Sequence, residues 1–335
     1  MAKNEKPERT KDYYGLLEVD SRARPEVIKA AFEAMTEASH EDKKMLALLE
    51  EAFGVLGDKE KREQFDEARQ EVVGKVVGDY HVLRLIATGG FGKTYVGEHV
   101  LTGEKVCVKH CALISRAVDE VLIAEAKAVW NLRHFGIPQV MNLIRLPDGS
   151  LALIMSYIPG KTIWQIVEEH GPIDPEHVAW ITERILNILK YLHFHGVVHG
   201  DMKPQNVIVQ KEHTVVLVDY GLAMVKPDLE SASKGYTKYF ASPEQMTQKP
   251  LLPESDFFGL GTTMIYALSG DLEYVKRKEV PKNTPTLIKE FIERLIVRDV
   301  LSRPKWENED LQETLVEIRK KCFGRRHSEM KPLSL

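Results

Sequence analysis

Apolar side chains follow two different spacings along the 335-residue chain, and the spacing changes near residue 80. In the first seventy residues they recur every three or four positions, as at Ile28, Ala31 and Phe32, which is the spacing of an amphipathic helix. Pro25 stands where such a helix would begin, and Gly57 stands where a second one would end. The N-terminal part is therefore predicted to be a small all-α domain.

From Tyr80 onward, apolar and polar residues alternate in short stretches separated by Gly-Gly and Thr-Gly-Glu turns, which is typical of β-strands. Longer helical patterns dominate after Gly160. A strand-rich part followed by a helical part, with the hinge-like segment 156–161 between them, predicts an α+β fold of two lobes. The expected strands include 80–86, 93–99, 104–110 and 151–158, and the expected helices are 117–132, 174–195, 256–269, 285–297 and 309–321.

Composition indicates where the domains meet. Gly74 and Gly78 lie between the helical part and the first strand pattern, and glycine makes a short connection flexible. We therefore expect a flexible N-terminus at 1–11, a helical domain at 12–70, a linker at 71–79, a two-lobed domain at 80–322 with lobes 80–158 and 159–322, and a C-terminal tail at 323–335.

Apolar residues make up 43% of the chain, charged residues 29%, and the net charge is −4, which is typical of a globular protein. So small a net charge gives no general electrostatic reason to expect a nucleic acid or an anionic membrane as partner. No segment approaches the ~18 consecutive apolar residues of a membrane helix, and the first residues lack the apolar centre of a secretion signal. Because three cysteines cannot form a disulfide framework, we expect a cytoplasmic protein.

The segment ATGGFGKTY, residues 87–95, is the first candidate nucleotide site. It nearly fits the P-loop pattern, in which a helix follows the glycines and binds phosphate. The residues from Thr94 to His99 instead alternate and include β-branched and aromatic types, and LTGE then turns the chain into another strand. A glycine-rich turn between two antiparallel strands is therefore expected.

Four polar motifs follow in order along the chain: Lys109 in VCVKH, Glu125 in AEAKAVWNLRH, HGDMKPQN at 199–206 and Asp219 in DYG. Together with the glycine loop, these motifs resemble the protein kinase superfamily over residues 80 to about 320. The resemblance implies a two-lobed kinase fold with a β-rich first lobe and a helical second lobe. It also implies that Lys109 holds the α- and β-phosphates of ATP, with Glu125 as its ion-pair partner.

The resemblance implies roles for the remaining motif residues as well. Asp201 would accept or orient the proton of the substrate hydroxyl, and Lys203 would steady the transferring γ-phosphoryl. Asn206 and Asp219 would bind Mg²⁺, which prefers oxygen ligands. The residues that would surround the nucleotide are Ala87, Gly89, Gly90, Phe91, Gly92 and Thr94 in the glycine loop, Cys107 and Ile208 on the two faces of adenine, Met155 as gatekeeper, and Ser156 and Ile158 through their backbone groups.

SPEQ at 242–245 resembles the motif that closes the activation segment of protein kinases. Glu244 would pair with Arg303, and Asp256 would anchor the catalytic loop, both as structural contacts. This segment favours a protein substrate, and Lys203 together with Thr237 resembles serine/threonine rather than tyrosine specificity.

Gly200 stands where many regulated kinases have an arginine that binds a phosphate of the activation segment. Glycine has no side chain to make that contact. We therefore expect that phosphorylation of Ser231, Ser233 or Thr237 is not the on-switch.

Residues 12–68 resemble a J-domain, a module that stimulates heat-shock ATPases, but its functional centre is altered. The His-Pro-Asp triplet of that family falls on His40, Glu41 and Asp42, and the preceding helix, which is basic in the family, carries Glu33 and Glu37. The reversed charge would oppose docking on the acidic surface of the ATPase. We expect a degenerate J-domain that acts as a docking or regulatory module, without productive chaperone stimulation.

The sequence thus predicts an ATP- and Mg²⁺-dependent serine/threonine protein kinase with a J-like module. Two alternatives stay open at this point: a nucleotide-binding pseudokinase scaffold, and a J-domain co-chaperone with an accessory kinase fold. The intact polar residues of the kinase motifs disfavour the scaffold, and the altered His40–Asp42 triplet disfavours the co-chaperone. Phosphotransfer from labelled ATP would separate the enzyme from both alternatives.

Overall fold

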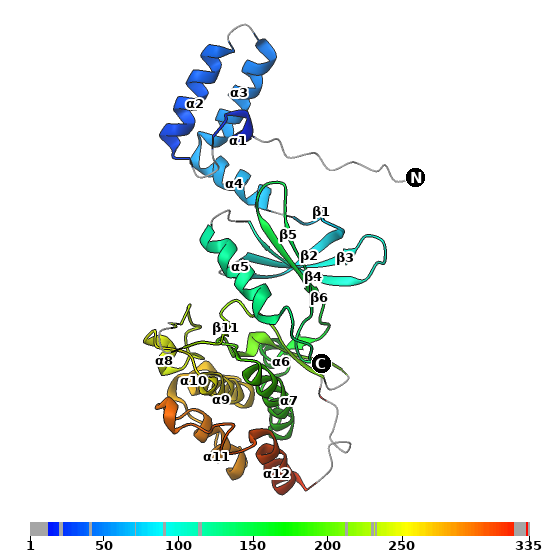
Figure 1. Cartoon of the computed structure of the whole chain (residues 1–335), viewed down its shortest axis with the longest axis vertical. Coiled ribbons are helices and arrows are strands. Elements are labelled where there is room, and N and C mark those ends of the chain that lie inside the picture. Colours follow the sequence, from blue (N-terminus) through cyan, green and yellow to red (C-terminus); the bar gives the residue numbers. More distant parts are fainter. Residues whose placement is uncertain are drawn as a thin grey trace. The chain divides into compact units, whose positions relative to one another are not determined.

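The structure, a computed structural model, divides into two compact units, Met1–Lys75 and Val76–Leu335 (Figure 1). The predicted N-terminus at 1–11, the residues His40 and Glu41, and most of the predicted tail lie outside the described residues. The structure describes residues 13–19, 23–39, 42–70, 72–89, 92–112, 116–211, 214–228, 231, 233–324 and 333.

The first unit is helical, as predicted. Its helices are α1 (Tyr13–Leu16), α2 (Pro25–Ala38), α3 (Lys43–Leu56) and α4 (Lys59–Gln70). Pro25 opens α2, and α3 ends directly before Gly57. The facing sides of α2 and α3 carry the apolar residues of the helical pattern, and the rings of Phe32 and Phe53 stack with centroids 4.3 Å apart. The likeness of this unit to a J-domain stays a prediction.

An arginine connects three segments of this helical unit. Arg62 on α4 donates a hydrogen bond from Nε to the Tyr14 hydroxyl over 2.9 Å and another to the Ala23 carbonyl oxygen over 2.9 Å. The Tyr14 hydroxyl in turn donates to Asp66 over 2.9 Å. These contacts close the end of the bundle at which α1, α2 and α4 meet.

The second unit begins with an antiparallel sheet in the order β1-β2-β3-β4-β6-β5, on which one helix packs. The predicted strands are present. The sheet also starts earlier than expected, because Val76, which lies in the predicted linker, pairs with His81. The elements are β1 (Val76–Val77), β2 (Tyr80–Gly89), β3 (Gly92–His99), β4 (Lys105–Cys111), α5 (Arg116–Val129), β5 (Val140–Arg145) and β6 (Leu151–Ser156).

Helices dominate the rest of this unit, so the predicted two-lobed α+β arrangement is present (Figure 1). The helices are α6 (Ile163–His170), α7 (Pro175–Phe194), α8 (Pro243–Met246), α9 (Pro253–Ser269), α10 (Leu272–Arg277), α11 (Thr286–Leu295) and α12 (Leu311–Phe323), with short 3₁₀ turns at Pro204–Asn206 and Val300–Ser302. Short strands join them: β7 (Lys161–Thr162), β8 (Val197–Val198), β9 (Val207–Val209), β10 (Val215–Leu217) and β11 (Met224–Val225).

Helix α9 lies in the centre of the helical lobe, and two glycines let its neighbours come close. A Cβ atom at Gly259 would lie 2.6 Å from Cβ of Met202, and one at Gly261 would lie 2.5 Å from Cγ2 of Ile296. Larger residues at these positions would push residues 199–206 and the end of α11 away. The close packing of α9 therefore fixes the position of residues 199–206.

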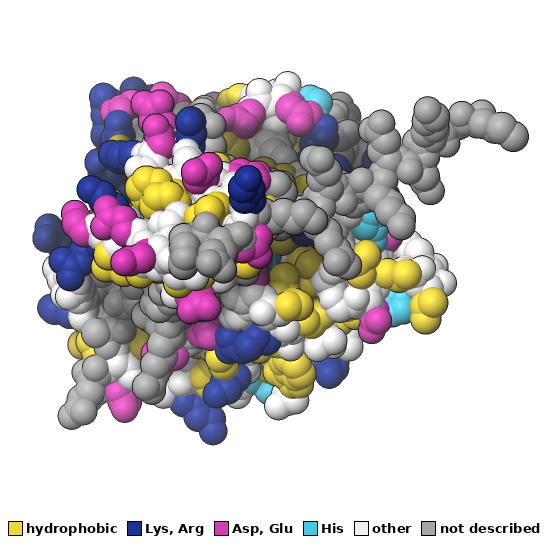
Figure 2. Space-filling model, turned by 90° about the horizontal axis from the view of Figure 1, so that it is seen from above, with side chains coloured by type: hydrophobic (Ala, Val, Ile, Leu, Met, Phe, Trp, Pro, Cys, Tyr) yellow, Lys and Arg dark blue, Asp and Glu magenta, His cyan; other side chains and the backbone are white. Residues whose placement is uncertain are grey.

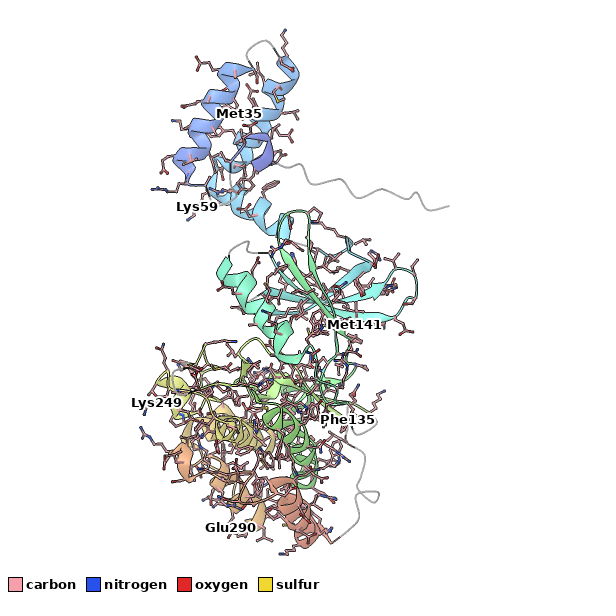
Figure 3. The ribbon with its side chains drawn as sticks, in the orientation of Figure 1. Met35, Lys59, Phe135, Met141, Lys249 and Glu290 are labelled. Carbon is pink, nitrogen blue, oxygen red and sulfur yellow. The ribbon has the colours of Figure 1, made fainter. Side chains whose placement is uncertain are left out.

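The surface of the protein carries charges of both signs. In the face shown in Figure 2, Lys and Arg side chains alternate with Asp and Glu side chains, in keeping with the net charge of −4. Single apolar side chains are also exposed, among them Phe135 and Met141 (Figure 3). Among the described residues, no helix has the length and apolar character needed to span a bilayer.

Candidate functional site

The predicted ion pair between Lys109 and Glu125 is present in the structure. Lys109 comes from β4 and Glu125 from α5, whose apolar face, including Leu122 and Ala126, is buried. Lys109 Nζ lies 2.8 Å and 2.7 Å from the two carboxylate oxygens of Glu125, which is 1% exposed. Burial raises the pKa of Glu125, and the nearby carboxylates hold the pKa of Lys109 above its ordinary value despite its own burial.

Asp219 is the second carboxylate on the same ammonium. Its Oδ1 lies 2.8 Å from Lys109 Nζ, and its side chain is still 43% exposed. Burial alone would raise the pKa of Asp219, but the charge of Lys109 outweighs that effect and lowers it. Asp219 has a left-handed backbone with φ 65°, and the buried Tyr220 beside it donates a hydrogen bond to the Leu217 carbonyl oxygen over 3.1 Å. The backbone around Asp219 is thus held by an aromatic neighbour.

Asp256 anchors the loop that carries HGDMKPQN, as predicted. It is 1% exposed on α9, and its carboxylate accepts hydrogen bonds from the backbone N–H groups of His199 and Gly200, both over 2.8 Å. His193 on α7 lies 2.9 Å from the same carboxylate. A buried carboxylate with several donors is well satisfied, so it holds the loop at a fixed place on α9.

Four polar side chains converge at the loop that Asp256 anchors. Asp201 Oδ2 lies 2.6 Å from Lys203 Nζ, and Asp201 Oδ1 accepts a hydrogen bond from the Thr237 hydroxyl over 2.7 Å. Lys203 also donates to the Thr237 hydroxyl oxygen over 3.1 Å. Asn206 donates its amide N–H groups to the Asp201 backbone oxygen and to Oδ2, so that its own amide oxygen faces away from Asp201.

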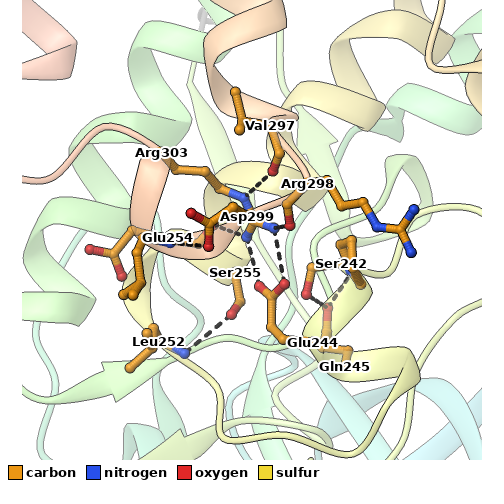
Figure 4. Close-up of polar contacts among 12 residues, drawn as sticks. Ser242, Glu244, Gln245, Leu252, Glu254, Ser255, Val297, Arg298, Asp299 and Arg303 are labelled. Carbon is orange, nitrogen blue, oxygen red and sulfur yellow. Dashed lines mark hydrogen bonds and ion pairs between the residues drawn. The ribbon is translucent and has the colours of Figure 1, made fainter.

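The predicted pair of Glu244 and Arg303 is also present (Figure 4). The guanidinium nitrogens lie 2.6 Å and 2.9 Å from the two carboxylate oxygens, the geometry of a bidentate pair. The Arg303 side chain is 0% exposed and that of Glu244 is 6% exposed. Arg303 donates further hydrogen bonds to the carbonyl oxygens of Glu254, Val297 and Arg298. This pair joins α8 to the chain that follows α11.

The glycine segment forms a hairpin between β2 and β3, as predicted, and no helix follows it as a P-loop would require. Ala87 pairs with Thr94 and Gly89 pairs with Gly92 across the two strands. A Cβ atom at Gly92, where φ is 138°, would lie 2.4 Å from the His110 backbone oxygen, so a larger residue would not fit there. The predicted loop residues Gly90 and Phe91 lie outside the described residues.

The residues predicted to contact adenine lie on strands of two different sheets and, for Ile158, on the connection between β6 and β7, and their role stays a prediction. Cys107 on β4 pairs with Met155 on β6, and Ile208 lies on β9. The Ser156 backbone N–H donates a hydrogen bond to the Gln139 carbonyl oxygen over 2.9 Å. Burial raises the pKa of the Cys107 thiol to about 12, so the thiol is neutral at ordinary pH.

Two further contacts order this region and were not predicted. Gln245 donates from its amide to the Gly200 carbonyl oxygen over 2.7 Å, while its amide oxygen accepts from the Ser242 N–H over 3.0 Å. The spacing of Ser242 and Gln245 is that of a helix capping box, a sequence signal that could have placed Gln245. Lys234 donates to the Ala223 carbonyl oxygen over 2.7 Å, a contact for which the sequence has no signal.

Comparison with known proteins agrees with this geometry. The family model described as "Protein kinase domain" matches residues 80–330. A probable serine/threonine-protein kinase of Dictyostelium discoideum is 30% identical over 205 residues, which is 59% of this chain and 40% of that protein. Serine/threonine-protein kinase ppk25 of Schizosaccharomyces pombe is 30% identical over 207 residues, 60% of this chain and 48% of its own.

A bacterial protein is similar as well. The probable serine/threonine-protein kinase PknB of Lactococcus lactis is 23% identical over 267 residues, 73% of this chain and 42% of its own. The chain thus spans less than half the length of each of these three relatives. The family match, by contrast, extends over most of this chain and includes every polar residue of the converging site. The chain therefore belongs to the protein kinase family.

Proposed function

We propose that this chain is a serine/threonine protein kinase that uses ATP and Mg²⁺. The observation that supports this proposal best is the arrangement of two polar groups of residues. Lys109, Glu125 and Asp219 form one ion-paired group, and Asp201, Lys203 and Thr237 with Asn206 form the other. A pseudokinase scaffold that acts only by binding other proteins would not need both groups.

The oxygen donors at this site fit Mg²⁺. Asp219 offers a carboxylate that is 43% exposed, and the Asn206 amide oxygen is turned away from the hydrogen bonds that its nitrogen makes. Hard divalent cations prefer such carboxylate and amide oxygens. Bound there, Mg²⁺ would supply neutralising charge to the phosphates of ATP. Lys109, whose ammonium Glu125 fixes, would add a second positive charge beside the phosphates.

The reaction would transfer the γ-phosphoryl group of ATP to a serine or threonine hydroxyl. The bond between the γ-phosphorus and the bridging oxygen of ADP breaks, a bond forms to the hydroxyl oxygen, and Asp201 orients and receives the hydroxyl proton. Lys203, 2.6 Å from Asp201, would stabilise the charge on the moving phosphoryl group. The contribution of these residues is mainly positioning and charge stabilisation.

Labelled ATP with Mg²⁺ and a generic protein substrate tests this proposal. Asp201→Asn and Asp219→Asn should each lower phosphotransfer by about 10²–10⁴-fold, the usual effect of losing a positioned proton acceptor or charge-stabilising group. Glu290→Gln, which removes an exposed carboxylate on α11, is the matched control and should keep full activity (Figure 3). ATP binding without transfer in the unmodified chain would instead identify the pseudokinase scaffold.

For residues 12–70 we propose a degenerate J-domain that docks a partner or regulates the kinase, without stimulating a heat-shock ATPase. The acidic outer surface of α2 supports this, since Glu33 and Glu37 are both exposed. Lys29 is the nearby cation on this helix, and it lies 3.8 Å from Glu33. An ATPase assay of a heat-shock chaperone with the full chain should show no acceleration, and a robust acceleration would contradict the proposal.

A further inference from the structure

Three lysines surround Tyr239, a residue of the segment that precedes α8. The ammonium of Lys238 lies 5.3 Å from the centroid of the Tyr239 ring, and that of Lys276 lies 5.2 Å from it. The ammonium of Lys278 donates a hydrogen bond to the Tyr239 carbonyl oxygen over 2.8 Å. We call Lys238, Lys276 and Lys278 the lysine cluster.

The backbone around Tyr239 is specifically held by this contact. Tyr239 has a left-handed backbone with φ 80°, which is unusual for an aromatic residue, and Lys278 has φ 56° at the end of α10. The Lys278 ammonium also lies 5.1 Å from the centroid of the Phe258 ring on α9. Helix α10 and its C-cap residue thus bring Lys276 and Lys278 against Tyr239.

The lysine cluster is close to the place where a substrate hydroxyl would be bound. Thr237 donates a hydrogen bond to Asp201 over 2.7 Å, and Tyr239 follows Thr237 by two residues. Consecutive Cα atoms are about 3.8 Å apart, so Tyr239 begins within about 8 Å of Thr237. A peptide whose hydroxyl lies at Asp201 therefore places residues one or two positions away beside the cluster.

The cluster carries an excess of positive charge. Lys276 has a carboxylate partner, Glu273, whereas no carboxylate contacts Lys238 or Lys278 among the described residues. The catalytic loop adds Lys203 and the uncharged Gln205 in this region, and its one carboxylate, Asp201, is already paired with Lys203. A peptide side chain of negative charge would be attracted here, and one of positive charge would be repelled.

We propose that the enzyme prefers substrates with an acidic residue one or two positions from the acceptor serine or threonine, and that the lysine cluster selects it. This inference rests on the proposed kinase function. A carboxylate and a phosphorylated side chain both carry the required negative charge. Peptides that contain one or the other show which of the two the enzyme prefers.

The test uses the full chain and a set of synthetic peptides with a single serine. Aspartate, phosphothreonine, asparagine or lysine is placed at each position from −3 to +3. The aspartate and phosphothreonine peptides should exceed the asparagine peptide by about 1.4- to fivefold in kcat/KM at one position next to the serine, the size expected for exposed ion pairs. Lysine there should lower kcat/KM below the asparagine value.

Variants identify the residues responsible. Lys238→Glu should remove the preference and make the lysine peptide better than the aspartate peptide at that position. Lys289→Glu is the matched control, because it makes the same change of charge on another helix, α11, at a lysine whose side chain is 44% exposed. The control should keep the wild-type preference.

The possible outcomes are distinct. Phosphotransfer to the peptides with equal rates for aspartate, asparagine and lysine overturns the inference but leaves the proposed function intact. An acidic preference that persists in Lys238→Glu and in a variant with both Lys238→Glu and Lys276→Glu also overturns it. Absence of phosphotransfer to every peptide and to every protein substrate would refute the proposed function itself.

Discussion

Replacing Glu244 by alanine removes the carboxylate partner of a guanidinium that is 0% exposed (Figure 4). Removal of one partner from a buried ion pair costs about 3–5 kcal/mol of unfolding free energy, because the remaining charge is left in a poorly solvated place. Arg303 keeps three backbone carbonyl acceptors in the Glu244→Ala variant. We therefore expect the lower end, about 3 kcal/mol, which corresponds to about 6–12 °C in Tm for a unit of this size.

Replacement of the other partner, Arg303, should lower the unfolding free energy further. Arg303→Met leaves the Glu244 carboxylate without its cation and also leaves the carbonyl oxygens of Glu254, Val297 and Arg298 without their donor. Each buried polar group without a partner adds to the cost. The loss should reach the upper end, about 5 kcal/mol. Glu293→Ala, which removes a carboxylate from an exposed pair, should change the unfolding free energy by less than about 1 kcal/mol.

Tryptophan fluorescence during urea unfolding measures this effect in the correct unit. The four tryptophans are Trp130, Trp164, Trp180 and Trp306, so none lies in residues 1–75. Unfolding of the helical N-terminal unit therefore does not contribute a tryptophan signal of its own. A loss below about 1 kcal/mol for Glu244→Ala, or a milder loss for Arg303→Met than for Glu244→Ala, would refute the reasoning.

The same pair predicts a dependence on pH. Burial alone would raise the pKa of Glu244, but the hydrogen bonds and charge of Arg303 outweigh it, and the pKa of Glu244 in the folded state lies below its ordinary value of 4.5. The pair therefore stabilises the fold above pH 4.5, and this contribution is lost as the pH falls through the lowered pKa. The acid-induced loss of stability should be smaller in Glu244→Gln, measured by urea unfolding at pH 7 and pH 4.

Three further predictions concern neighbouring residues. Gly200→Ala should destabilise the fold by about 1–2 kcal/mol in the same assay, because φ is 73° and the new Cβ would lie 2.8 Å from the Leu222 backbone oxygen. Gly235→Ala, whose new Cβ would have its nearest neighbour at 3.4 Å, should be nearly neutral. Phosphatase treatment should leave phosphotransfer unchanged, and a loss restored by phosphorylation of Ser231, Ser233 or Thr237 would contradict this. Burial lowers the pKa of Lys278 to about 8. Between pH 8 and 10.5 the unfolded state therefore binds more protons than the folded state, and the stability of the fold should rise with pH over this range. Urea unfolding of Lys278→Met should show a smaller rise.

The sequence was most informative where side chains of fixed chemistry recur in a fixed order. The pairs of Lys109 with Glu125 and of Glu244 with Arg303 were predicted because each partner belongs to a motif, although 59 residues separate the second pair. Helix limits at Pro25 and Gly57 were predictable from local backbone chemistry.

Contacts that depend on tertiary placement were not predictable. Val76 and Val77 form a strand of two residues between glycines, too short for an alternation pattern to be recognised. The hydrogen bond from Lys234 to the Ala223 oxygen and the left-handed backbone of Tyr239 depend on how separate segments fold back on one another. No spacing rule in the sequence describes either feature.

The Lys109 ammonium has three N–H donors, and its three short contacts, two to Glu125 and one to Asp219, occupy all of them. In the proposed kinase reaction, a phosphate oxygen of ATP would therefore compete with a carboxylate that is already bound. Glu125 is 1% exposed, whereas the Asp219 side chain is 43% exposed and can exchange its contact for water or a cation. In that reaction Asp219 would be the carboxylate that gives way, so the binding of ATP and the release of Asp219 from Lys109 would occur together.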